Sequence, residues 1–130
     1  MNQQKGQFRG LDHIDIVVED VAAMQAFFES VGFEVIRQTD HGGGAVELRF
    51  PGDGDQPILE LTPLEGANGA KRRLGLRHMA LRVTDIDAAV IDLTRRGLRI
   101  DKPPRVIAET GRRLTNLVDP VGNSLQIVEG

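Results

Sequence analysis

The sequence predicts an α+β fold in which two βαβββ repeats form a barrel-like open cleft. The first observation is a repeated pattern, L-x-H-φ-x-φ-x-V-x-D-φ with φ apolar, at residues 11–21 and 76–86. The two histidines of this pattern, His13 and His78, are 65 residues apart (78 − 13), which is half of the 130-residue chain. The second observation is that a helical pattern follows each copy and stops at Gly32 or Gly97, 19 residues after each histidine (32 − 13 and 97 − 78). The whole unit, strand and helix together, therefore occurs twice.

The first copy contains one helix and four strands. Residues 11–18 alternate in polarity and are rich in Ile and Val, which predicts a strand. Asp20 is a helix N-cap candidate, and apolar residues at helical spacing follow it as far as Gly32. Further strands are expected at residues 33–39, 45–50 and 57–62. His41, beside three glycines at residues 42–44, is expected in a solvated hairpin turn, and these glycines lack the G-K-[ST] ending of a phosphate loop.

The second copy repeats this order. A strand at 76–83 precedes a helix at 86–96 that Asp85 caps, and a turn at 119–123 precedes the last strand. The later strands are expected near residues 98–101, 112–118 and 123–128. Residues 66–75 form a small, polar and basic linker. We therefore predict one domain over residues 1–130, built from modules at 8–65 and 75–130.

Composition excludes several classes of function. Lys and Arg number 16 against 19 Asp and Glu, a net charge of −3, and Trp and Tyr are absent, so we expect no nucleic-acid partner. The chain has no cysteine, which excludes disulfides, thiolate catalysis and cysteine-bound metals. No apolar run approaches the ~18 residues of a membrane helix, and residues 1–6 have no secretory apolar core. We therefore expect a cytoplasmic protein without a membrane partner.

Two pairs of polar residues occupy matching positions in the repeat. His13 and His78 lie in the two first strands, and Glu60 and Gln126 lie in the two last strands. Four nitrogen and oxygen donors placed in this way could converge on a divalent ion such as Ni, Co, Mn, Fe or Zn. One histidine on a strand is more often structural, but two at equivalent positions favour a shared role. Glu60 and Gln126 could instead face solvent, although a carboxylate between apolar neighbours is costly to bury without a partner.

These patterns resemble the vicinal oxygen chelate superfamily, which includes glyoxalase I, extradiol dioxygenases, methylmalonyl-CoA epimerase, and fosfomycin and bleomycin resistance proteins. The resemblance covers residues 11–129. It depends on the two histidine-containing strands, on Leu59-Glu60-Leu61-Thr62 and on the Asp119-Pro120-Val121-Gly122-Asn123 turn before Gln126. It implies an open cleft, a homodimer, a small-molecule substrate and a divalent metal held by His13, Glu60, His78 and Gln126.

The sequence departs from the family at the last strand. Glyoxalase I and extradiol dioxygenases usually have Glu where this chain has Gln126, and an amide is a weaker ligand and no base. Glu60 then becomes the candidate for the catalytic base. The metal ligands of methylmalonyl-CoA epimerase resemble His, Gln, His and Glu in chain order. This chain has His, Glu, His and Gln, which is the same set with the two halves of the repeat exchanged. Glu129, three residues beyond Gln126, should point to the opposite face of the strand.

An arginine four residues after a ligand histidine contacts a substrate carboxylate in glyoxalase I-like members. Arg82 has this spacing from His78 and is the candidate substrate-binding residue. An arginine that only faces solvent on a strand would give the same sequence pattern. Arg49 is a weaker candidate for anion binding.

The resemblance therefore implies a divalent-metal-dependent, glyoxalase I-like lyase or isomerase that acts on a substrate chelating through neighbouring oxygens. A metal-free, bleomycin-resistance-type binding protein is the alternative from another class. An extradiol-type dioxygenase ranks third, and a purely structural interaction protein ranks last because it would leave the matched histidines unexplained.

Overall fold

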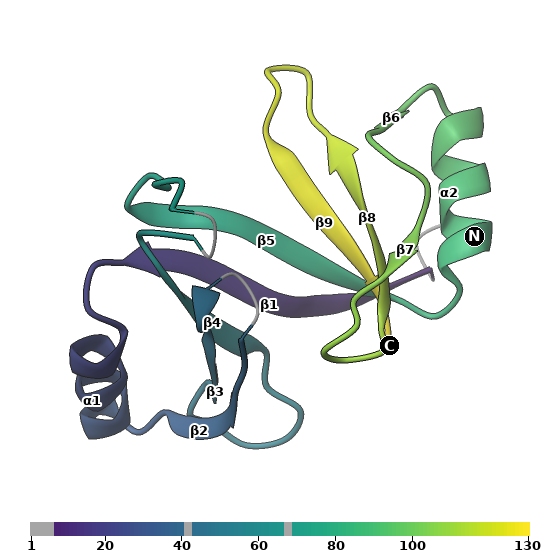
Figure 1. Cartoon of the computed structure of the whole chain (residues 1–130). Helices are drawn as coiled ribbons and strands as arrows, with labels where there is room; N and C mark the ends of the chain where they lie inside the picture. Colours follow the sequence, from purple (N-terminus) through teal and green to yellow (C-terminus); the bar gives the residue numbers. More distant parts are fainter. Residues whose placement is uncertain (1–6, 41–42, 67–68) are drawn as a thin grey trace. The chain divides into compact units, whose positions relative to one another are not determined.

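The α+β class with two βαβββ repeats is confirmed in the computed structural model, which describes residues 7–40, 43–66 and 69–130 (Figure 1). Backbone contacts divide the chain into two compact units. The first unit is His13–Arg77, and the second unit combines the residues before His13 with His78–Gly130. The module limits predicted from the repeat, 8–65 and 75–130, stay predictions.

The first unit contains one helix beside a four-stranded sheet. Its elements are β1 (Phe8–Val18), α1 (Val21–Val31), β2 (Glu34–Gln38), β3 (Val46–Arg49) and β4 (Ile58–Pro63), of which β1 begins in the second unit. The strand order is β2-β3-β4-β1, with β1 parallel to β4 and the other neighbours antiparallel. These elements confirm the predicted strands and helix. His41 and Gly42, predicted to lie in a hairpin turn, are outside the described residues.

Local capping explains why α1 begins and ends where it does. The Asp20 side chain accepts a hydrogen bond from the Ala23 N–H at 3.0 Å. At the other end Gly32 has a φ of 115°, in the left-handed region that favours glycine. The Phe33 N–H then donates to the Phe28 carbonyl and closes the helix end. Both predicted helix limits are therefore confirmed.

Strand alternation gives the first sheet two chemically different faces. Val46, Leu48, Leu59 and Leu61 are buried, and together with Val18 they pack against apolar side chains of α1. Successive side chains on a strand point to opposite faces. Glu47 and Glu60 therefore point away from α1, and the same alternation along β1 places His13 and Asp15 with them.

The second unit repeats the arrangement with one additional short strand. Its elements are β5 (Gly75–Val83), α2 (Ile86–Arg95), β6 (Arg99–Ile100), β7 (Arg105–Val106), β8 (Arg113–Val118) and β9 (Ser124–Glu129). The first three residues of β5 belong to the first unit. The strand order is β5-β9-β8-β6, and β7 also pairs with β8. As in the first unit, the first and last strands, β5 and β9, are parallel.

One predicted strand is shorter than expected. The segment 98–101 forms only the two-residue β6, and β7 was not predicted. The chain between them contains Pro103 and Pro104, which have no N–H to donate to a ladder. The Thr115 hydroxyl bonds the Lys102 carbonyl there instead. The outer edge of this sheet is therefore two short pieces rather than one strand.

Both ends of α2 resemble those of α1. Asp85 accepts from the Ala88 N–H at 3.1 Å, and Gly97 has a φ of 83°, two residues beyond a helix that ends at Arg95. The Glu129 carboxylate also accepts from the Ile86 N–H at 3.0 Å. Glu129 therefore points toward α2, away from the face of Gln126, as the sequence predicted.

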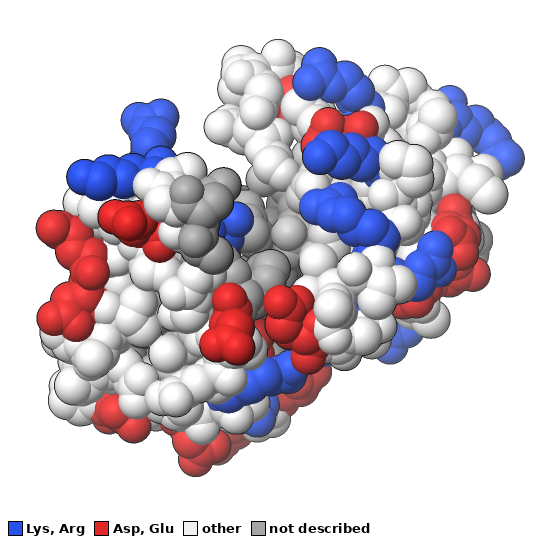
Figure 2. All heavy atoms as spheres, in the orientation of Figure 1, with Lys and Arg blue, Asp and Glu red and all other residues white. Residues whose placement is uncertain are grey.

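Charged side chains of both signs are interspersed on the face drawn in Figure 2. Among the described residues, neither helix has the length and apolar character required to cross a membrane.

Candidate metal centre

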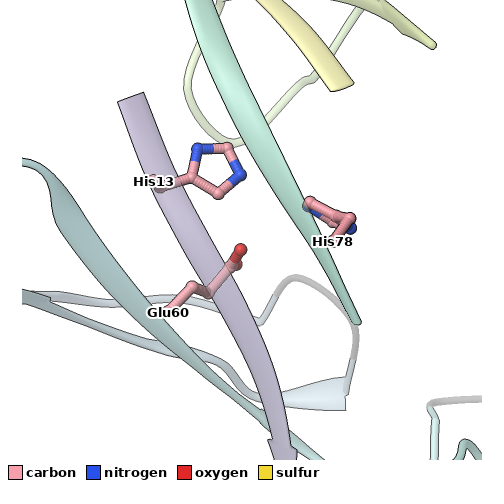
Figure 3. A group of neighbouring side chains, drawn as sticks. All are labelled: His13, Glu60 and His78. Atoms are coloured by element: carbon pink, nitrogen blue, oxygen red, sulfur yellow. The ribbon is translucent and has the colours of Figure 1, made fainter. Parts of the chain in front are cut away.

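Three of the four predicted ligands lie together. His13, Glu60 and His78 each offer one ligand atom, and these atoms all lie within 4.8 Å of one another. Figure 3 shows the three side chains pointing toward one another. Glu60 is only 7% exposed, whereas the two histidines are half-buried.

Strand register explains the spacing of His13 and Glu60. In the parallel pair β1 and β4, His13 lies opposite Ile58 and Asp15 opposite Glu60. Glu60 is therefore two positions along from His13 on the same face. The second unit has the same offset, because Gln126 on β9 lies opposite Ala80, two residues after His78. Gln126 thus occupies the backbone position equivalent to Glu60, and its role as a ligand stays a proposal.

Glu60 is the middle member of a row of three carboxylates, here called the acidic row. Asp15 lies opposite Glu60 on one side and Glu47 on the other. Arginines border the row: Arg37 lies 3.5 Å from Glu47, and Arg77 donates to Asp15 at 3.0 Å. Three negative groups between two positive ones leave the row one negative charge in excess when all are ionised.

Asp15 is held rigidly within this row. It is fully buried, and one carboxylate oxygen accepts from the Thr62 hydroxyl at 2.6 Å while the other accepts from Arg77. It also shares a side-chain hydrogen bond with Glu60. A buried carboxylate needs such partners to offset its loss of hydration.

The environment of Glu60 favours its protonated form when no cation is present. Burial, the charges of Asp15 and Glu47 and the hydrogen bond to Asp15 together raise the pKa of Glu60 from 4.5 to about 8, against the opposing effect of Arg77. A bound cation would have the opposite effect and favour the carboxylate.

These residues fit a divalent ion. Donor atoms on one ion lie at most about 4.4 Å apart, twice a bond of ~2.2 Å, so a spacing within 4.8 Å requires only a small adjustment. Two imidazoles and a carboxylate suit Zn and the other first-row ions named above. The buried Glu60 and its two acidic neighbours also supply excess negative charge where a cation would bind.

Arg82 lies on the same face of β5 as His78 and is tied to another carboxylate. Its Nε donates to Asp12 at 3.1 Å, and Asp12 is only 2% exposed. Arg112 donates to both oxygens of Asp12 at 2.7 and 3.1 Å. Two guanidinium groups thus share one buried carboxylate. Arg49, the weaker candidate, is exposed two residues beyond Glu47 on β3.

Sequence reasoning missed Asp15, Glu47 and Arg77. A signal was present for Asp15 and Glu47, because each alternates with core residues on a predicted strand and therefore lies on the face of the ligands. The partner of Arg77 could not be found in this way, since the pairing of Arg77 with Asp15 depends on a contact between residues 62 positions apart.

Comparison with known proteins decides the family. The model of the Glyoxalase/Bleomycin resistance protein/Dioxygenase superfamily matches residues 10–127. The chain belongs to this superfamily. The resemblance seen in the sequence is thereby confirmed. Related sequences include YwkD of Bacillus subtilis, 30% identical over 93% of this chain and 97% of that protein, and YaeR of Escherichia coli, 33% identical over 90% and 93%.

Solved structures with the same fold include methylmalonyl-CoA epimerases. One has a TM-score of 0.77 at 20% identity and covers 95% of this chain and 96% of its own. The epimerase from Mycobacterium tuberculosis has a TM-score of 0.74 at 27% identity, over 95% of this chain and 89% of its own. A variant of the Streptomyces coelicolor epimerase, in complex with 2-nitronate-propionyl-CoA, has a TM-score of 0.72 at 29% identity, over 95% and 98%.

Proposed function

We propose that this protein is a divalent-metal-dependent isomerase or lyase that acts on a small substrate binding through neighbouring oxygens. The observation that carries the proposal is the group formed by His13, Glu60 and His78. Similarity to methylmalonyl-CoA epimerases at 27–29% identity supports an acyl thioester with a second carbonyl or carboxylate as the substrate. A glyoxalase I-like hemithioacetal is the second substrate to test, because both reactions move a proton at a carbon beside a carbonyl.

The proposed ligands are His13, Glu60 and His78, with Gln126 as a fourth. Bound there, a divalent ion would act as a Lewis acid and lower the cost of negative charge on a substrate carbonyl oxygen. The chain itself must supply the proton acceptor. We assign that role to Glu60, and Glu47, directly opposite on β3, is the nearest further carboxylate of the same face.

The proton transfer balances without another reactant. A carboxylate oxygen takes the proton from the carbon, and the electron pair moves to the carbonyl oxygen. In an epimerisation a proton then returns to the opposite face of the same carbon. In the hemithioacetal it returns to the neighbouring carbon, while the hydroxyl proton of the first carbon passes to the former carbonyl oxygen. Arg77 and Thr62 hold Asp15 beside Glu60, which fixes the position of the acid–base group. The positive charge shared by Arg82 and Arg112 suits a substrate carboxylate, as proposed for Arg82 from the sequence.

Exchange of the substrate proton with solvent tests this function directly. The metal-loaded protein is incubated in D₂O with methylmalonyl-CoA, and in parallel with the hemithioacetal of methylglyoxal and glutathione, and deuterium uptake is followed by NMR. Uptake that requires metal and disappears in Glu60→Gln supports the proposal. If metal-loaded protein catalyses neither exchange, the proton-transfer function is wrong.

A metal-free binding protein is the second candidate. It is favoured by Gln126 in place of a carboxylate and by the self-contained bonding of Glu60 with Asp15. Substrate or drug binding that is equally tight with and without metal would support it.

A homodimer is also proposed, and sedimentation equilibrium of the purified chain would test it.

A further inference from the structure

The second unit carries a neutral counterpart of the acidic row. Gln126 lies opposite Ala80 on β5 and opposite Asn116 on β8, in the same register that joins Asp15, Glu60 and Glu47. We call Ala80, Gln126 and Asn116 the amide row. Thr115 and Ile127 point toward α2, so Asn116 and Gln126 point to the opposite face, which they share with His78.

One hydrogen bond fixes the orientation of the Asn116 amide. The Ser124 hydroxyl donates to the Asn116 Oδ1 at 3.1 Å. With its oxygen engaged, the Asn116 side chain presents its NH₂ group as a donor on that face. Among the residues that the structure describes, neither this NH₂ group nor the side chain of Gln126 has a hydrogen-bond partner.

The surroundings of the two amides are apolar. Ala80, Leu114 and Val128 are buried on the same face and pack together with Ile107. A hydrogen bond made beside such residues is stronger than one made in water, because competing solvent is reduced. Asn116 and Gln126 are themselves half-buried, so a ligand can still reach them.

We propose that Asn116 and Gln126 form a donor pair that binds a carbonyl oxygen of the substrate. Aspartate or glutamate at either position would repel such an oxygen, whereas two NH₂ groups on neighbouring strands can donate to it together. The role is compatible with Gln126 as a ligand, since coordination through its oxygen leaves its NH₂ group available. The identity of the substrate rests on the function proposed above, but the donor pair does not.

Calorimetric titration of the metal-loaded protein tests the pair. The probes are methylmalonyl-CoA, which carries a thioester carbonyl and a carboxylate, and oxalate, which carries two adjacent carboxylates as oxygen acceptors. We expect Asn116→Asp to weaken binding at least ~10-fold and Asn116→Leu about 5- to 20-fold, because a donor is lost or reversed. Ser124→Ala should have a smaller effect. Thr115→Val, the neighbour on β8 that faces α2, is the matched control and should bind as the unmodified protein does.

Side-chain amide signals in ¹⁵N NMR spectra provide a second readout that does not depend on activity. The NH₂ signals of Asn116 and Gln126 should shift on addition of a probe, whereas that of Asn123, which bonds Asp119 in the turn, should not. Unchanged affinity in both Asn116 variants, or no shift at Asn116 and Gln126 with either probe, overturns the pair. Loss of the proposed function appears separately, as bound probe without proton exchange.

Discussion

The acidic row and the amide row share one backbone register but differ in chemistry. In the first unit the row reads Asp15, Glu60 and Glu47, and in the second it reads Ala80, Gln126 and Asn116. On the helix-facing side of the same strands, the two units agree, with Leu59 and Leu61 matched by Leu125 and Ile127. The repeat therefore preserves the side chains that build the core and varies those on the opposite face, which carries His13 in the first unit and His78 in the second.

This difference indicates that the two units have different chemical roles, here called the division of roles. Carboxylates accept protons and bring negative charge to a cation, whereas carboxamides are neutral at neutral pH: they make hydrogen bonds and are weaker metal ligands, but they cannot act as a base. The first unit can therefore supply acid–base chemistry and charge, and the second can supply neutral recognition. Substitutions that make one row resemble the other test this distinction.

Glu60→Gln makes the centre of the acidic row identical to that of the amide row, and it should have the largest effect. We expect metal-dependent proton exchange to fall by about 10²- to 10⁴-fold, because the variant lacks the acid–base group. Gln126→Glu is the reciprocal variant: its substrate binding should weaken, as in Asn116→Asp, but at saturating substrate it should retain exchange within about tenfold, since Glu60 is still present. Equal losses of proton exchange in both variants would contradict the division of roles between the two units.

Asp15→Ala copies Ala80 into the acidic row. Thr62 and Arg77 would lose their shared acceptor, so we expect the free energy of unfolding to fall by about 2–3 kcal/mol. Chemical denaturation of the metal-free protein measures this loss. Ala80→Ser, which adds a polar group to the amide row instead, is the comparison. If Asp15→Ala leaves stability unchanged, the buried network is not what holds the row.

The pH dependence of stability should also distinguish the acidic row, which contains a titrating carboxyl group, from the neutral amide row. The folded-state pKa of Glu60, about 8, lies above its ordinary value of 4.5, so the folded state binds the proton more tightly. The metal-free protein should therefore lose stability as pH rises from 4.5 to 8. Glu60→Gln lacks this loss, and its advantage should grow by about 1–2 kcal/mol between pH 6 and pH 8. Parallel pH profiles would show that Glu60 is ionised throughout.

The smallest expected difference between the two units is in the stability that each helix N-cap contributes. Asp20→Ala should cost about 1 kcal/mol of stability, since α1 loses its capping oxygen. Asp85→Ala should cost less, because Glu129 continues to accept from the first N–H of α2. Thermal unfolding of the two variants measures the difference, and a larger loss for Asp85→Ala would show that Glu129 does not compensate.

Much of this organisation could be predicted from the sequence because it depends on local signals. Alternation and capping residues located both helices and most strands, and the repeat offset paired His13 with His78. The division of the last sheet edge into β6 and β7 was missed, although Pro103 and Pro104 mark it. Ion pairs such as Arg112 with Asp12 could not be predicted, because they join residues 100 positions apart whose contact only the folded chain defines.

The site residues show the same limit. His13, Glu60 and His78 were selected as ligands because equivalent positions in a repeat converge, and the structure brings the three together. The hydrogen-bond network that restrains Glu60 depends on which side chains reach one another across strands, and sequence spacing does not specify this.

The central claim is that His13, Glu60 and His78 bind one divalent ion. Titration of the metal-free protein with Co²⁺, followed by its visible absorption, tests it most directly. We predict one ion per chain, with affinity reduced at least ~100-fold in His13→Ala, His78→Ala and Glu60→Gln but unchanged in His41→Ala. Absence of binding, or binding that the first three substitutions leave intact, would contradict the claim.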